Sequence, residues 1–70
     1  MKLSETINEY EQIKQSHIVK LHKLTEILDS VPTGCNIDLQ NGLVIKIHTQ
    51  RITIVTIGEF IETLKKVTEL

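Results

Sequence analysis

The chain has 70 residues, a mass of 8.0 kDa, a formal net charge of −1 and one cysteine. These values exclude two full domains, a disulfide-stapled secreted scaffold and a generic polycationic nucleic-acid binder. With 40% hydrophobic residues, the chain is expected to fold as one domain over residues 1–70. The lone cysteine is compatible with a reducing, cytoplasmic setting. The longest uncharged apolar stretch, residues 52–57, is far shorter than the ~20 residues of a membrane helix, so we expect no membrane span.

The first predicted element is a long helix over about residues 3–29. Its apolar residues recur at helical spacing and fall on one face. They are Leu3, Ile7, Tyr10, Ile13, Ile18, Leu21, Leu24 and Leu28. Pro32 ends the helix, because it lacks the backbone N–H and restricts Val31 before it.

Three strands are predicted next, because apolar and polar residues alternate over 35–40, 43–48 and 51–55. Asn41 and Gly42 are a typical hairpin signal. A three-residue loop over 40–42 pairs Leu39 with Leu43 and places the apolar side chains on one face, which predicts a positive φ at Gly42. The three strands form an antiparallel meander.

The last predicted element is a C-terminal helix that opens with a capping box at residues 56–59. Its apolar side is formed by Phe60, Ile61, Leu64 and Val67. The predicted fold is therefore α+β, in the order α-β-β-β-α, with both helices on one sheet face.

The sequence offers no catalytic, metal-binding or cofactor-binding constellation. Cys35 and His48 fall on opposite faces of the predicted sheet, so no base lies beside the thiol. His17 and His22 are five residues apart, about 140° on a helix, and do not share a metal as an i, i+4 pair does. We therefore expect a protein that is not an enzyme and binds no cofactor or metal.

Two apolar surfaces favour self-association. The first helix is about 40 Å long and overhangs strands of ~20 Å, so its exposed apolar residues need a partner. The residues expected to form an antiparallel homodimer there are Leu3, Ile7, Tyr10, Ile13, His17 and Leu21. The other surface is the edge strand over 51–55, where the stretch 52–57 carries no charge. Val44 and Val55 lie near it on the outer sheet face. Either a second chain or the C-terminal helix would cover this edge.

The leading hypothesis is a small, non-enzymatic, homodimeric protein-interaction module, a regulator or inhibitor with an unknown protein partner. Lysine outnumbers arginine 7 to 1 and alanine is absent, which indicates AT-rich coding, of the sort found in phages and other mobile elements. The alternative is a weak nucleic-acid-binding module that uses the basic outer sheet face of Lys46, His48 and Arg51. Three cationic groups neutralise only a few phosphates, so nucleic acid is the less favoured partner.

Overall fold

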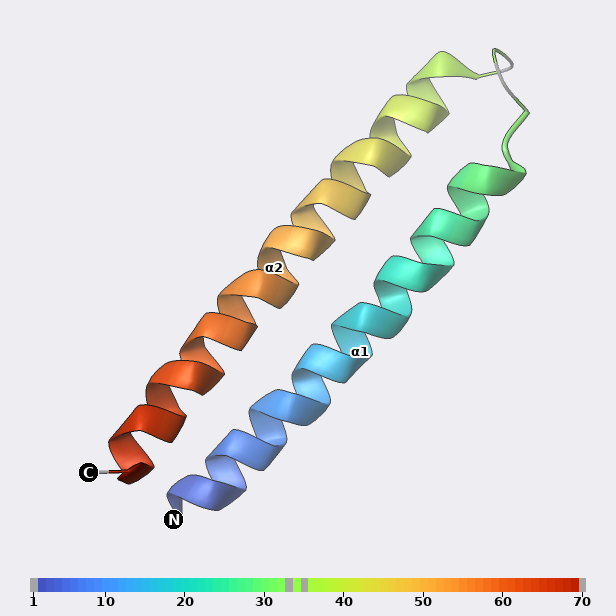
Figure 1. Cartoon of the computed structure of the whole chain (residues 1–70). Helices are drawn as coiled ribbons and strands as arrows, with labels where there is room; N and C mark the ends of the chain where they lie inside the picture. Colours follow the sequence, from blue (N-terminus) through green and yellow to red (C-terminus); the bar gives the residue numbers. More distant parts are fainter. Residues whose placement is uncertain (1, 33, 35, 70) are drawn as a thin grey trace.

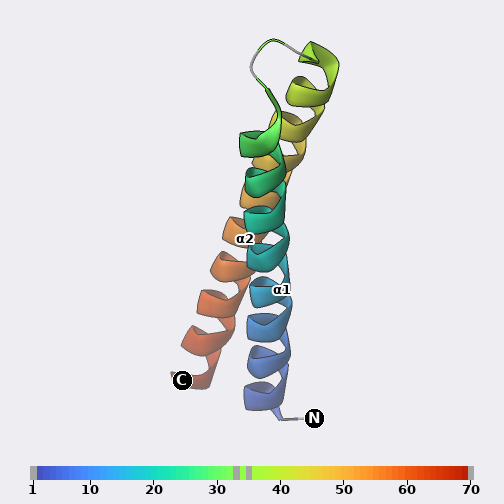
Figure 2. The ribbon, with the colours of Figure 1, turned by 90° about the vertical axis from the view of Figure 1, so that its right-hand side faces the viewer.

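The structure of the chain is a computed structural model that describes residues 2–32, 34 and 36–69. Within this part of the chain two helices, α1 (Leu3–Ser30) and α2 (Ile37–Glu69), form an antiparallel hairpin. Figure 1 shows them side by side along their length, with the start of α1 beside the end of α2. In Figure 2, where α1 lies in front, the two helices cross at a shallow angle. The principal extents are 54 × 14 × 14 Å, so the molecule is a rod.

The predicted α+β fold is wrong. The described residues contain no strand, and the region predicted as a meander forms the first part of α2. The predicted C-terminal helix is the continuation of the same helix, so residues 56–59 lie inside α2 and cap nothing. The first helix is confirmed: α1 ends at Ser30, and Val31 takes extended backbone angles (φ −77°, ψ 122°) before Pro32. The predictions made for Cys35 fall outside the described residues.

The contact between the helices, hereafter the seam, follows a heptad pattern. Facing residues alternate in steps of three and four, the spacing that lets two helices pack side by side over many turns. In α1 these residues are Leu3, Ile7, Tyr10, Lys14, His17, Leu21, Leu24 and Leu28. In α2 they are Gln40, Leu43, Ile47, Gln50, Ile54, Ile57, Ile61 and Leu64. All of them are buried or half-buried.

The fully buried core is very small. Among the described residues only Leu43, Ile47 and Ile61 are buried, at 7%, 7% and 2% exposure. All three belong to α2, and α1 contributes only half-buried side chains. Each helix therefore covers one side of the other and leaves the rest of it open to solvent.

Several local interactions are formed within α2, although the segment is rich in β-branched residues. The Oδ1 of Asn36 accepts a hydrogen bond from the backbone N–H of Leu39 at 3.0 Å, which caps the start of α2. Thr53 and Thr63 each donate a hydroxyl to the carbonyl four residues earlier, both at 3.0 Å. These hydroxyls are therefore satisfied within the helix. Lys66 lies in the last turn, where the helix dipole favours a cation.

The positive φ expected at Gly42 is also wrong, since Gly34 (φ 81°) is the only described residue with one. Gly42 lies inside α2, and a Cβ added to it would meet nothing within 4 Å. We therefore expect Gly42→Ala to stabilise the protein by about 0.5–1 kcal/mol, because alanine loses less backbone entropy in a helix. Urea unfolding followed by circular dichroism measures the change. Gly34→Ala is the opposite control, because its left-handed backbone disfavours a side chain. A less stable Gly42→Ala protein would contradict the helical assignment.

Candidate interaction surface

The middle of the seam is polar. The side chains of His17 and Gln50 form a hydrogen bond across it. Three residues earlier on α1, Lys14 passes over Gly58, where an added Cβ would lie 3.6 Å from the lysine Nζ. A side chain at this position would therefore make only an ordinary van der Waals contact with the lysine. Polar groups in an apolar seam select one register, at a cost in stability.

Two further contacts join the helices toward the chain ends. The rings of Tyr10 and Phe60 meet edge to face, with centroids 4.9 Å apart at 73°. Lys65 Nζ lies 3.4 Å from Glu11 Oε1, and these side chains are 47% and 41% exposed. An ion pair this exposed contributes less than about 1 kcal/mol, so the apolar seam residues carry most of the stability.

The residues predicted for self-association through the first helix already have a partner in this structure. Five of them lie in the seam against α2, namely Leu3, Ile7, Tyr10, His17 and Leu21. The sixth, Ile13, is outside the heptad spacing and 44% exposed. The expected antiparallel neighbour of the first helix is thus the second helix of the same chain. Self-association through these residues stays a prediction.

A second apolar face runs along α2, away from the seam. We define it as the outer stripe, formed by Val44, His48, Ile52, Val55 and Glu59. Successive members are three or four residues apart, so they share one side of the helix. Its aliphatic side chains are all more than half exposed, at 52%, 54% and 58% for Val44, Ile52 and Val55. The outer stripe is therefore an apolar helix face with no covering element in the described part of the chain.

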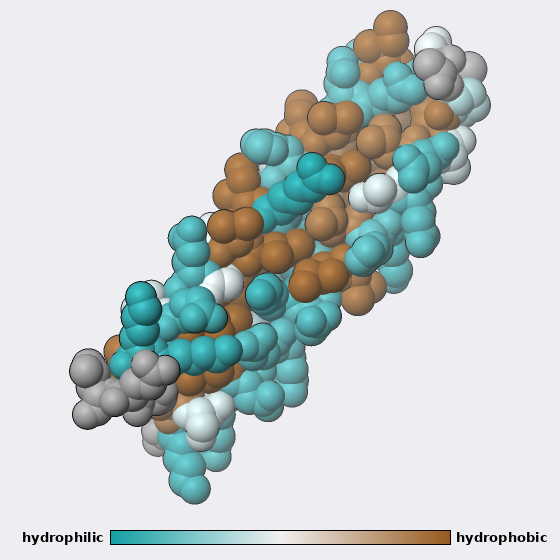
Figure 3. Space-filling model, in the orientation of Figure 1, coloured by the Kyte–Doolittle hydropathy of each residue, from teal (hydrophilic) through white to brown (hydrophobic). Residues whose placement is uncertain are grey.

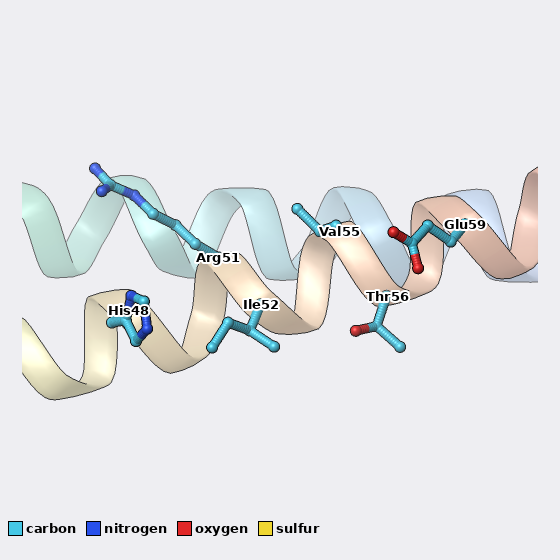
Figure 4. A pocket seen from close by; sticks show the side chains of 6 residues that line it. All are labelled: His48, Arg51, Ile52, Val55, Thr56 and Glu59. Atoms are coloured by element: carbon cyan, nitrogen blue, oxygen red, sulfur yellow. The ribbon is translucent and has the colours of Figure 1, made fainter.

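Two shallow hollows make this face concave. One, of about 460 Å³, lies along α2 and is lined by His48, Arg51, Ile52, Val55, Thr56 and Glu59 (Figure 4). The other, of about 340 Å³, reaches the seam and is lined by Thr25, Leu28, Val44, Ile47, His48 and Arg51. The hollows share His48 and Arg51 and therefore adjoin each other; together they extend along α2 from position 44 to position 59, and we call this shallow stretch the groove. At 1.5 Å per residue this groove is about 22 Å long, a length suited to a helix.

The figures show how this groove is distributed over the hairpin. In Figure 3 apolar surface gathers over α2 and along the line between the helices, whereas the outer edge of α1 is largely hydrophilic. In Figure 4 the Arg51 side chain extends toward the start of α2, and Glu59 lies at the other end of the group. The groove thus has an apolar middle between a cation and an anion.

The basic face proposed for nucleic acid does not form. It was predicted on the outside of a sheet, and α2 replaces that sheet. His48 and Arg51 are neighbours that line both hollows, but Lys46 lines neither. At 100° per residue, Lys46 lies about 160° around the helix from His48. The structure therefore separates Lys46 from His48 and Arg51.

Among the described residues, no group of three or more His, Cys, Asp or Glu side chains is arranged to hold a metal ion. In the same residues, no helix combines the length and apolarity needed to cross a membrane. Comparison with known protein families, with curated proteins and with solved structures finds no match to this chain.

Proposed function

We propose that this chain is a small, non-enzymatic protein-interaction module that works as a homodimer. The observation that carries the proposal is its exposed surface, 5417 Å². Size scaling gives about 4,450 Å² for a compact monomer of this mass. The excess of about 1,000 Å² is close to the ~800 Å² that each partner of a standard protein interface buries.

The distribution of apolar side chains supports association with another helical surface. Eleven large hydrophobic residues among those described are substantially exposed, and eight of the eleven belong to α2. With three buried residues, one hairpin has little core of its own. Two hairpins that pack together bury apolar faces that each hairpin leaves open to solvent.

A homodimer of this kind acts by binding rather than by chemistry, which fits a regulator or inhibitor of another protein. We propose a cytoplasmic setting, because the single cysteine gives the chain no internal disulfide. Nucleic acid is the weaker alternative partner, since Lys46 lies on another side of α2 from His48 and Arg51.

Sedimentation equilibrium at micromolar concentration tests this function. We expect a mass near twice the 8.0 kDa of one chain, falling toward the monomer on dilution. Helicity measured by circular dichroism should fall together with the mass, because burial between hairpins stabilises both helices. A stable helical monomer at high micromolar concentration would contradict the proposal.

A further inference from the structure

We propose that the homodimer forms through the outer stripe, with α2 of one copy antiparallel to α2 of the other and a twofold axis beside Val55. This inference rests on the proposed function and adds the surface, the orientation and the register. The occupant of the groove is thus a second copy of the same helix.

The charges at the two ends of the groove are self-complementary. Arg51 and Glu59 each lie four residues, about 6 Å along the helix, from Val55. Neither side chain has an ion pair within the described residues. A twofold axis at Val55 brings Arg51 opposite Glu59 of the partner subunit, and Glu59 opposite the partner's Arg51. A parallel arrangement in the same register would instead bring like charges together.

The same register provides an apolar centre. Val55 meets its own copy on the axis, and Ile52 lies one turn away on each side, so both exposed side chains lose contact with water. His48 comes opposite Glu62 of the partner subunit, which adds a second complementary pair. The groove from 44 to 59 is as long as four helical turns, so one helix face fills it.

The other helix offers no comparable face. Only Ile13, Val19 and Ile27 are large exposed hydrophobic residues of α1. At 100° per residue Val19 lies about 120° around the helix from Ile13. Ile27 is on the same side as Ile13 but about 21 Å farther along the helix axis. Acidic and basic side chains occupy the exposed positions around them. A second copy therefore buries more apolar surface on α2 than on α1.

Charge reversal tests this arrangement. Arg51→Glu and Glu59→Arg should each raise the Kd of the homodimer by about tenfold or more, because each change turns two attractive pairs into two repulsive ones. The double variant, Arg51→Glu with Glu59→Arg, should recover the original Kd. An equimolar mixture of the two single variants should form a heterodimer, because one chain then carries two anions and the other two cations. Sedimentation velocity measures all four samples.

Lys23→Glu and Glu26→Lys on the exposed side of α1 are the matched controls, and neither should change the Kd. Circular dichroism of each variant verifies that the hairpin still folds. If the original protein dimerises but the α2 variants behave like the controls, this interface is wrong and the proposed function stands. Weakening by Lys23→Glu alone would point to pairing through α1 instead. A monomeric original protein would overturn both proposals.

Discussion

Replacing Ile61 by alanine should destabilise the protein by about 2–4 kcal/mol, because it removes the most buried side chain of the seam and leaves a cavity. At roughly 0.05–0.15 kcal/mol per residue, a chain of this length has a total stability of roughly 3.5–10 kcal/mol. The substitution therefore removes a large part of it. The measurement is the free energy of unfolding from urea titration followed by circular dichroism, at one fixed protein concentration.

Val19→Ala is the control for this substitution. Val19 is 51% exposed on the side of α1 that faces away from the seam, and alanine has the higher helix propensity. We expect the control to change stability by less than about 0.5 kcal/mol. Equal losses from the two truncations would mean that Ile61 does not form the core of the hairpin.

Substitutions in the polar His17–Gln50 pair of the seam should have a second large effect on the free energy of unfolding. One variant should lower it and another should raise it. His17→Ala should destabilise the protein by about 1–3 kcal/mol, because it leaves the half-buried amide of Gln50 without its partner. Replacing both residues by leucine should raise stability above that of the original protein by about 1 kcal/mol or more, since apolar contact then replaces the hydrogen bond.

The double-leucine variant should also lose specificity. Once the seam is apolar at this level, neighbouring registers and other oligomers become closer in energy. Sedimentation should then show a broader distribution of species than the original protein gives. A double-leucine variant less stable than His17→Ala would show that the pair stabilises the fold rather than selecting its register.

The first helix was predictable from sequence because most of its apolar residues fall on a single face, with mainly polar residues elsewhere. The second was not, because α2 has two apolar faces. Leu43 and Ile47 belong to the seam, whereas Ile45 between them is 65% exposed on another side. Likewise Ile54 is in the seam and Ile52 in the outer stripe. Along the sequence, the apolar residues of these two faces fall at every second position. Such an alternation of apolar and other residues is the pattern of a strand.

Local residue preferences also favoured the predicted strands over a helix in this segment. Asn41 and Gly42 favour a turn, and isoleucine, valine and threonine favour strands. The sequence does contain the helical spacing, because the seam residues from Gln40 to Leu64 follow one another in steps of three and four. This spacing is continuous only if Gln50, a polar residue, is counted as a seam residue. A polar side chain belongs there only because His17 faces it, and the sequence does not show that pairing.

Val44 and Val55 were expected to be near neighbours on the outer face of the sheet. In the structure both belong to the outer stripe, but they lie 11 residues apart, about 16 Å along α2. Whether a second chain covers them stays a prediction. Ile52, which also belongs to the outer stripe, was predicted on the opposite face of the sheet from Val55. Residues three apart point to opposite faces of a strand, whereas they share one face of a helix. The same exposed residues that made the segment resemble strands thus form the candidate interface.

The antiparallel hairpin also determines how contacts between the helices are ordered along the chain. The hydrogen bond from Gln40 to the Pro32 carbonyl joins positions eight apart, whereas the His17–Gln50 pair spans 33. The entropy of closing a loop grows only slowly with its length, by about 0.6 kcal/mol per doubling. Contacts near the connection between the helices therefore form with the smallest loss of chain entropy. Once they have formed, each contact farther along the helices closes only a short additional loop. Folding can thus nucleate at that end and proceed toward the chain ends, and local opening should begin at the chain ends, where the helices separate first.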